Sequence, residues 1–118
     1  MRRDSNKTIV VASRDPNFAD IQKRILEAAG YQIFPVSNIK EVEKACAVGT
    51  IDLVIIGYSL PTAEKRRVVH EARKHCKAPI LELYEGDKPE LADIYTHRSE
   101  LPEDFLDAVN SILRPRQQ

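Results

Sequence analysis

The stretch from residue 52 to residue 61 reads Asp52-Leu53-Val54-Ile55-Ile56-Gly57-Tyr58-Ser59-Leu60-Pro61. Its apolar run is short, unbroken and rich in β-branched residues, a pattern typical of a strand buried on both faces in the middle of a parallel sheet. In open α/β sheets, ligands and chemistry gather where such strands end at their carboxyl side. Gly57 and its spatial neighbours are therefore the first place to look for function.

Strand and helix patterns alternate on both sides of this run. Apolar or alternating runs predict further strands at residues 8–12, 31–36, 79–84 and 94–96. Apolar residues at helical spacing predict helices at 16–29, 39–48, 63–74 and 102–113. Asp15 is the expected N-cap of the first helix, and Gly30 follows its end. The alternation implies a three-layer, doubly wound, flavodoxin-like parallel sheet of five strands in the order 2-1-3-4-5.

The connection between the fourth and fifth strands is short. Only about ten residues separate Tyr84 from Tyr95, close to the minimum for a strand-helix-strand crossover. The helix of this crossover, the fourth in such a fold, is therefore expected to be shortened or missing. Its loss would uncover part of the sheet, and an uncovered apolar patch often marks an interaction site.

Length and charge narrow the class of protein. The 118 residues suit one domain, with a core at about 7–113 and a tail or linker start at 114–118. Basic and acidic side chains balance at 18 each, which argues against broad binding to nucleic acid or to an anionic membrane. No apolar run is long enough to span a membrane, and a cytoplasmic location is expected.

The cysteines and histidines suggest neither cross-links nor metal. Cys46 and Cys76 are too few and too far apart in sequence for a disulfide framework or a zinc knuckle, so reduced cysteines are expected, with Cys46 as a small core residue. His70 and His75 are five residues apart, which does not place them on one helix face. With His97 and Cys76 they form no metal motif, so neither a metal nor another cofactor is predicted.

The ordered set of patterns resembles the receiver domain of bacterial two-component response regulators. The resemblance covers roughly residues 7–113, and its best local match is the stretch 52–61. Supporting matches lie at 10–16, at Gly30-Tyr31 and at 102–106. The family implies a signalling module that contacts protein partners: a kinase, another receiver or an output domain.

Departures from the family fall on the residues that perform its chemistry. Receivers accept a phosphoryl group on an aspartate that ends the third strand, and this position is Gly57 here. The acidic pair that would hold Mg²⁺ corresponds to Ser13 and Arg14. Glycine cannot form an aspartyl phosphate, and an arginine repels Mg²⁺. The hydroxyl residue that ends the fourth strand corresponds to Tyr84, and the lysine after the fifth strand corresponds to Arg98.

The resemblance and its departures together predict a degenerate receiver, or pseudo-receiver, that signals by protein contact without phosphorylation. Tyr95 stands where the family often carries a switching aromatic residue. No nucleophile-base pair is assignable, so the domain is not expected to be an enzyme. The oligomeric state stays open, a homodimer included.

A ligand-binding domain is the alternative. It would use a strand-end pocket for a small ligand or an anion, formed by Ser13, Arg14, Gly57, Tyr84 and Arg98. The competing interpretation is a decayed pocket whose arginines pair with Asp15 or Glu85, and this second interpretation is favoured because charged clusters are only probabilistic markers of sites.

Overall fold

Five strands and four helices alternate along the chain. The computed structural model describes residues 7–48, 50–57, 60–76, 78–84, 94–97 and 102–113, with the side chains of all but residues 48, 84, 94–97 and 102–104. The strands are β1 (Thr8–Ala12), β2 (Gln32–Val36), β3 (Leu53–Ile56), β4 (Ile80–Tyr84) and β5 (Ile94–His97). The helices are α1 (Pro16–Ala28), α2 (Ile39–Val48), α3 (Thr62–His75) and α4 (Pro102–Leu113).

The sheet has the predicted topology. Its strand order is β2-β1-β3-β4-β5, and every neighbouring pair is parallel. Ala12 at the end of β1 lies in register with Ile56 at the end of β3, which in turn lies in register with Glu82 near the end of β4. The carboxyl ends of the three central strands therefore meet at one edge of the sheet, as the flavodoxin-like fold requires.

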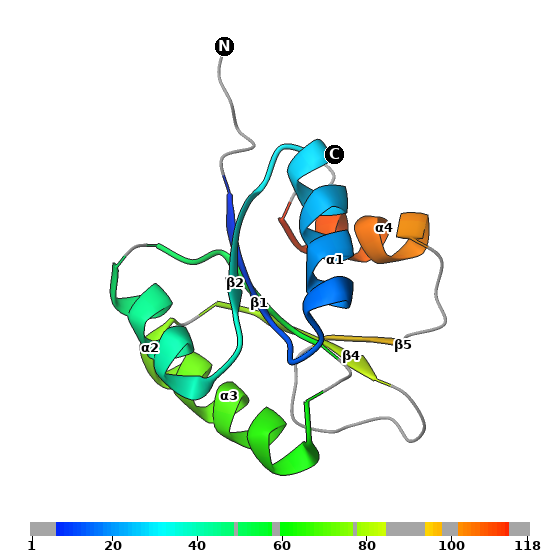
Figure 1. Ribbon diagram of the computed structural model, residues 1–118. Helices are drawn as coiled ribbons and strands as arrows, with labels where there is room; N and C mark the ends of the chain where they lie inside the picture. The colour runs from blue at the N-terminus through cyan, green and yellow to red at the C-terminus, as the bar shows by residue number, and fades with distance from the viewer. Residues whose placement is uncertain are drawn as a thin grey trace.

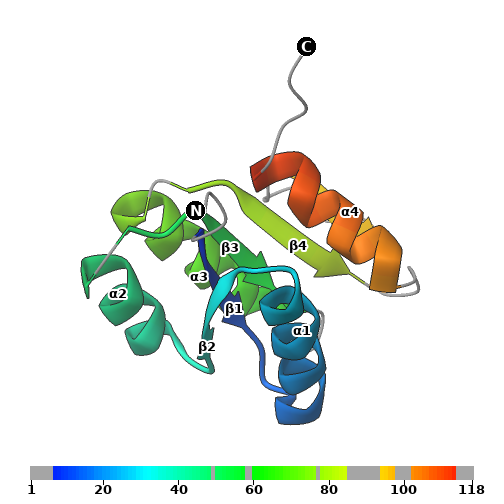
Figure 2. The same ribbon diagram turned by 90° about the horizontal axis from the view of Figure 1, so that it is seen from above.

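Helices cover both faces of the sheet. Figure 1 shows α1 and α4 on one side and α2 and α3 on the other, and Figure 2 shows the same three layers from above. All four residues of β3 are buried: Val54 and Ile56 belong to the core on the side of α2 and α3, whereas Leu53 and Ile55 belong to the core on the other side. Each such side chain contributes about 1.5–3 kcal/mol by leaving water.

The first helix begins and ends as its sequence predicts. The carboxylate of Asp15 accepts hydrogen bonds from the backbone N–H groups of Asn17 and Phe18, at 3.1 and 3.2 Å. Gly30 follows the helix with a φ of 100° and donates its N–H to the carbonyl of Glu27. A positive φ favours glycine, which explains the sharp turn that leads into β2.

The expectation of reduced cysteines is wrong. Cys46 of α2 and Cys76, which caps the end of α3, form a disulfide with Cα atoms 4.9 Å apart. Their separation of 30 residues in sequence says little about their distance in space, because α2 and α3 lie side by side on the same face of the sheet (Figure 1). Cys46 is not a free core thiol; both cysteines are partly buried and pack against the core under these helices.

Two further expectations concern the connection between β4 and β5 and the absence of a membrane-spanning segment. β4 and β5 are parallel neighbours, and only residues 85–93 connect them. These residues lie outside the described part of the chain, so the loss of the crossover helix stays a prediction. Among the described residues, no helix combines the length and the apolar character needed to cross a membrane.

Candidate functional site

The carboxyl ends of β1 and β3 bring Ser13 and Gly57 together. Gly57 follows β3 directly, is buried, and donates its backbone N–H to the carbonyl of Ala12 at 2.7 Å. Ser13 follows β1, is only 5% exposed, and donates its N–H to the carbonyl of Val36 at 3.1 Å. The structure thus places these two positions next to each other at the sheet edge.

Gly57 lies so close to Ser13 that a side chain would have to displace its neighbours. A Cβ atom added at Gly57 would lie 3.1 Å from the carbonyl oxygen of Ala12, 3.1 Å from the Ser13 Cβ and 3.2 Å from the Ser13 Oγ. Favourable contacts between carbon atoms are about 3.5–4.0 Å long. The Ser13 hydroxyl also accepts a hydrogen bond from the N–H of Asp15 at 3.1 Å, which keeps it beside Gly57. The space at the end of β3 is thus closed on the side of β1.

Arg14 forms an ion pair with Glu64 of α3 rather than with Asp15. The expected partner, Asp15, instead caps α1. Glu85, the other expected partner, lies outside the described residues. The Arg14 side chain is 54% exposed and that of Glu64 is 30% exposed, so the pair contributes only about 0–1 kcal/mol to stability. Its structural effect is to connect the end of β1 to the first turn of α3.

The remaining predicted site residues lie partly or wholly outside the described part of the chain. Tyr84 ends β4 in register with His97, and Tyr95 lies in β5 in register with Glu82. The side chains of both tyrosines, and all of Arg98, fall outside what the structure describes. The structure therefore places Ser13 beside Gly57 and pairs Arg14 with Glu64. The roles of Tyr84, Tyr95 and Arg98 stay predictions.

Two open grooves adjoin the strand ends. One, of about 520 Å³, holds Ser13 and Arg14 together with residues of α1 and of the end of β2. The other, of about 810 Å³, lies along α2 and α3 and also includes Arg14. Gly57 lines neither groove. Both walls mix positive and negative side chains: the smaller groove carries Lys23 beside Asp20 and Glu41. Such a mixture does not favour a strongly anionic ligand.

A buried ion pair lies directly under the strand ends. Glu82 of β4 is 2% exposed, and its carboxylate lies 3.1 Å from the Nζ of Lys65 of α3, whose side chain is 14% exposed. Glu82 is level with Ile56, one residue before Gly57. Sequence reasoning missed this pair, although a signal was present: a lone acid stands inside the apolar strand run, and glutamate is almost never fully buried unless it is paired.

The carboxylates described around the strand ends all have partners. Asp15 caps α1, Glu64 pairs with Arg14, and Glu82 pairs with Lys65. Mg²⁺ in proteins is usually held by one or two carboxylates together with water and phosphate oxygens. The described residues at this edge therefore resemble a closed, internally neutralised structure more than a ready metal site.

A parallel five-stranded sheet in the order 2-1-3-4-5, with helices on both faces and the strand ends as its candidate site, defines a flavodoxin-like domain. No protein-family model and no curated protein sequence matches the chain. Among solved structures, the response regulator protein TrrA from Thermotoga maritima, in complex with Mg²⁺-BeF, is 30% identical, with 90% of this chain and 98% of that chain covered and a TM-score of 0.76.

Two further structures extend this likeness. TrrA in complex with the histidine kinase ThkA matches at 29% identity, with 91% and 98% of the two chains covered and a TM-score of 0.76. A two-component response regulator from Clostridium difficile matches at 18% identity, with 96% and 100% covered and a TM-score of 0.82. The chain belongs to the response regulator receiver family and is a signalling module of that class.

Proposed function

We propose that this domain is a pseudo-receiver, which transmits a signal through contact with a protein partner and without accepting a phosphoryl group. The observation that carries the proposal is the close packing of Gly57 on Ser13 at the end of β3. An aspartyl phosphate requires a carboxylate nucleophile at the phosphorylated residue, and glycine has none. In place of the acidic pair, Ser13 is engaged with the backbone of Asp15 and Arg14 with Glu64.

A protein partner follows from the class of domain. The structure of TrrA bound to the histidine kinase ThkA contains a receiver that is 29% identical to this chain. We propose a kinase, another receiver or an output domain as the partner of this chain, with no catalytic activity of the domain itself. The proposed location is the cytoplasm, where such partners meet receivers.

The first prediction is that the domain does not respond to phosphoryl donors. We expect no phosphoryl mass in intact-mass spectra after incubation with acetyl phosphate and Mg²⁺, and no change in melting temperature with Mg²⁺ and beryllofluoride. The physical reason is the missing nucleophile, together with the missing hard oxygen ligands for the ion. TrrA, whose structure contains Mg²⁺-BeF, is the positive control for the assay.

Gly57→Asp sharpens this test. The variant restores a carboxylate, but its Cβ would crowd Ala12 and Ser13, and Arg14 would still repel Mg²⁺. We therefore expect Gly57→Asp alone to remain unphosphorylated while it folds, as judged by circular dichroism. A phosphoryl adduct on the wild-type domain would contradict the proposal. An adduct on Gly57→Asp alone would show that Ser13 and Arg14 do not block the reaction.

The second prediction is that partner binding is independent of phosphorylation. A kinase or output domain that is first identified by co-purification with this domain should bind it with the same affinity in the presence and absence of Mg²⁺ and beryllofluoride. Isothermal titration calorimetry measures both states. Ile21 of α1 and Phe34 of β2 are exposed apolar side chains, and Ile21→Glu and Phe34→Glu compare two faces for the contact. An affinity that rises at least tenfold with beryllofluoride would contradict the proposal.

Ligand binding at the strand ends is a second candidate function. The groove of about 520 Å³ beside Ser13 and Arg14 favours it, whereas the engagement of Arg14 with Glu64 disfavours it. A thermal-shift screen with nucleotides, phosphosugars and acidic metabolites tests this candidate. A saturable shift that Arg14→Ala abolishes would support it, and no shift with any of these ligands would exclude those classes of ligand.

A further inference from the structure

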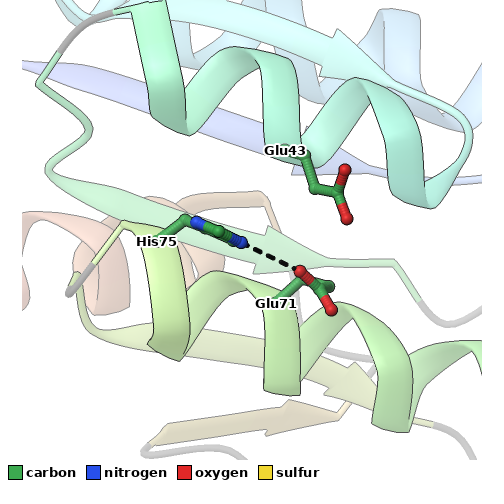
Figure 3. A group of neighbouring side chains, drawn as sticks. All are labelled: Glu43, Glu71 and His75. Atoms are coloured by element: carbon green, nitrogen blue, oxygen red, sulfur yellow. Dashed lines mark ion pairs between the residues drawn. The ribbon is translucent and has the colours of Figure 1, made fainter.

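Three metal-ligating side chains converge between α2 and α3, away from the strand ends. They are Glu43 of α2 and Glu71 and His75 of α3, and Figure 3 shows them facing the space between the two helices. Each offers one ligand atom, and these atoms all lie within 4.8 Å of one another. Glu71 and His75 are four residues apart, so one face of α3 presents both to the neighbouring helix.

One carboxylate of this group has no partner among the described residues. The His75 Nε2 lies 3.1 Å from the Glu71 carboxylate. In the described part of the chain, the Glu43 carboxylate has neither a hydrogen bond nor an ion pair, although it is held near the Glu71 carboxylate. Two like charges at this distance repel each other, and a cation between them removes the repulsion.

The donor set indicates the class of cation. One imidazole nitrogen and two carboxylate oxygens are ligands that suit Zn²⁺, which takes three protein ligands and a water in open sites. Imidazole also suits other late divalent transition metals, whereas Mg²⁺ and Ca²⁺ prefer oxygen ligands throughout. The imidazole therefore distinguishes this group from an ordinary acidic surface patch.

We propose that Glu43, Glu71 and His75 bind a divalent transition metal ion of the zinc class, which bridges α2 and α3. The ion replaces the direct contact between His75 and Glu71 and adds Glu43 of the other helix as a ligand. This site goes beyond the proposed function and does not depend on it, because it uses none of the strand-end residues. The bound ion would hold α2 and α3 together, so the stability of this face would depend on the metal.

The disulfide supports the geometry of the site. Cys46 lies three residues after Glu43 on α2, and Cys76 directly follows His75 on α3. The covalent link therefore holds the two helices together within one turn of Glu43 and His75. A metal site gains affinity when its ligands are already placed before the ion arrives, since less ordering is needed on binding.

The test uses untagged, oxidised protein, because a histidine tag or free thiols would bind zinc themselves. A thiol assay first verifies that no free cysteine is present. Zn²⁺ is then titrated calorimetrically, and the melting temperature is followed with Zn²⁺, Mg²⁺ or Ca²⁺ in excess. We expect one Zn²⁺ per chain and a melting temperature that rises with Zn²⁺ concentration, as for any ligand of the folded state. Mg²⁺ and Ca²⁺ should produce no comparable rise.

Three variants locate the site. His75→Ala removes the imidazole and should weaken Zn²⁺ binding by about tenfold or more, because even loss of an outer-shell partner costs about 10–100-fold. Glu43→Gln keeps the size of the side chain but removes the ligand from α2, and it should also weaken binding. His70→Ala removes another exposed imidazole from the same helix and is the matched control. It should leave the affinity unchanged.

Several results would overturn the proposal. They are no Zn²⁺ binding to the wild-type protein, an equal loss in His70→Ala, or a rise in melting temperature with Mg²⁺ equal to that with Zn²⁺. Unchanged affinity in Glu43→Gln would confine any binding to α3 and would overturn the bridging role. All three substitutions are at surface positions, so their unliganded melting temperatures serve as the check on folding.

Discussion

Replacing Lys65 with Met is expected to lower the free energy of unfolding by about 3–5 kcal/mol, the loss typical of leaving a buried charge without its partner. The substitution keeps most of the apolar stem of Lys65 but removes the ammonium group 3.1 Å from the Glu82 carboxylate. Glu82 is 2% exposed, and its strand β4 lies between β3 and β5. Urea denaturation followed by circular dichroism measures the change.

Removing the acidic partner instead of the basic one should reduce stability by less. Glu82→Leu leaves Lys65, but this lysine is more exposed and has a flexible stem that can carry its ammonium group to solvent. We therefore expect a loss of roughly 1–3 kcal/mol for Glu82→Leu. In the double variant, both charges are gone and two apolar side chains take their place. Its stability should approach or exceed that of the wild type, because such replacements are often neutral or stabilising.

An exposed ion pair provides the control for this prediction. Asp20 and Arg24 form a pair one turn apart on α1 with a 3.1 Å contact, and both side chains are more than half exposed. Asp20→Ala should change stability by less than about 1 kcal/mol. If Lys65→Met costs no more stability than Asp20→Ala, the prediction is contradicted, and the Lys65–Glu82 pair contributes no more than an exposed ion pair.

Loss of the Cys46–Cys76 disulfide is the second large effect. Reduction, or the double variant Cys46→Ala/Cys76→Ala, should lower the free energy of unfolding by about 3–4 kcal/mol at 25 °C. The value follows from the loop entropy that a cross-link across 30 residues removes from the unfolded chain. Urea midpoints with and without dithiothreitol measure it, and the wild type should lose stability on reduction.

The double variant is also the control for the reductant. It has no cysteine pair, so dithiothreitol should leave its urea midpoint unchanged. An equal midpoint for oxidised and reduced wild type would contradict the prediction and would mean that the cross-link does not stabilise the fold.

Patterns local to the chain predicted the architecture well. The strands and helices follow from their periodicities, because period 2 and period 3.6 place side chains on faces without reference to the rest of the fold. The strand order follows from the doubly wound arrangement that alternating strands and helices imply. The caps of α1 are equally local: Asp15 reaches backbone groups two and three residues ahead. The meeting of Ser13 and Gly57 was predictable for the same reason, since both follow strands whose order was known.

Contacts between elements were not predictable in this way. The disulfide, the Arg14–Glu64 pair and the Lys65–Glu82 pair each join two different elements. Periodicity states which face of a helix is buried but not which residue of the next element lies opposite, because this depends on the rotation and sliding of packed helices. Helix spacing already places Glu71 beside His75 on α3, whereas Glu43 of α2 becomes their neighbour only through packing.

Residues 52–61 illustrate the difference between features that are local to the sequence and features that depend on packing. By itself, the sequence determined that 53–56 is a central buried strand and that Gly57 brings no carboxylate to its end, since burial pattern and residue identity are local properties. Only the tertiary structure decided that Ser13 closes the space beside Gly57, that a buried ion pair lies beneath it, and that α2 and α3 are cross-linked. Those features depend on distances between segments far apart in the chain, which are set when the whole core packs.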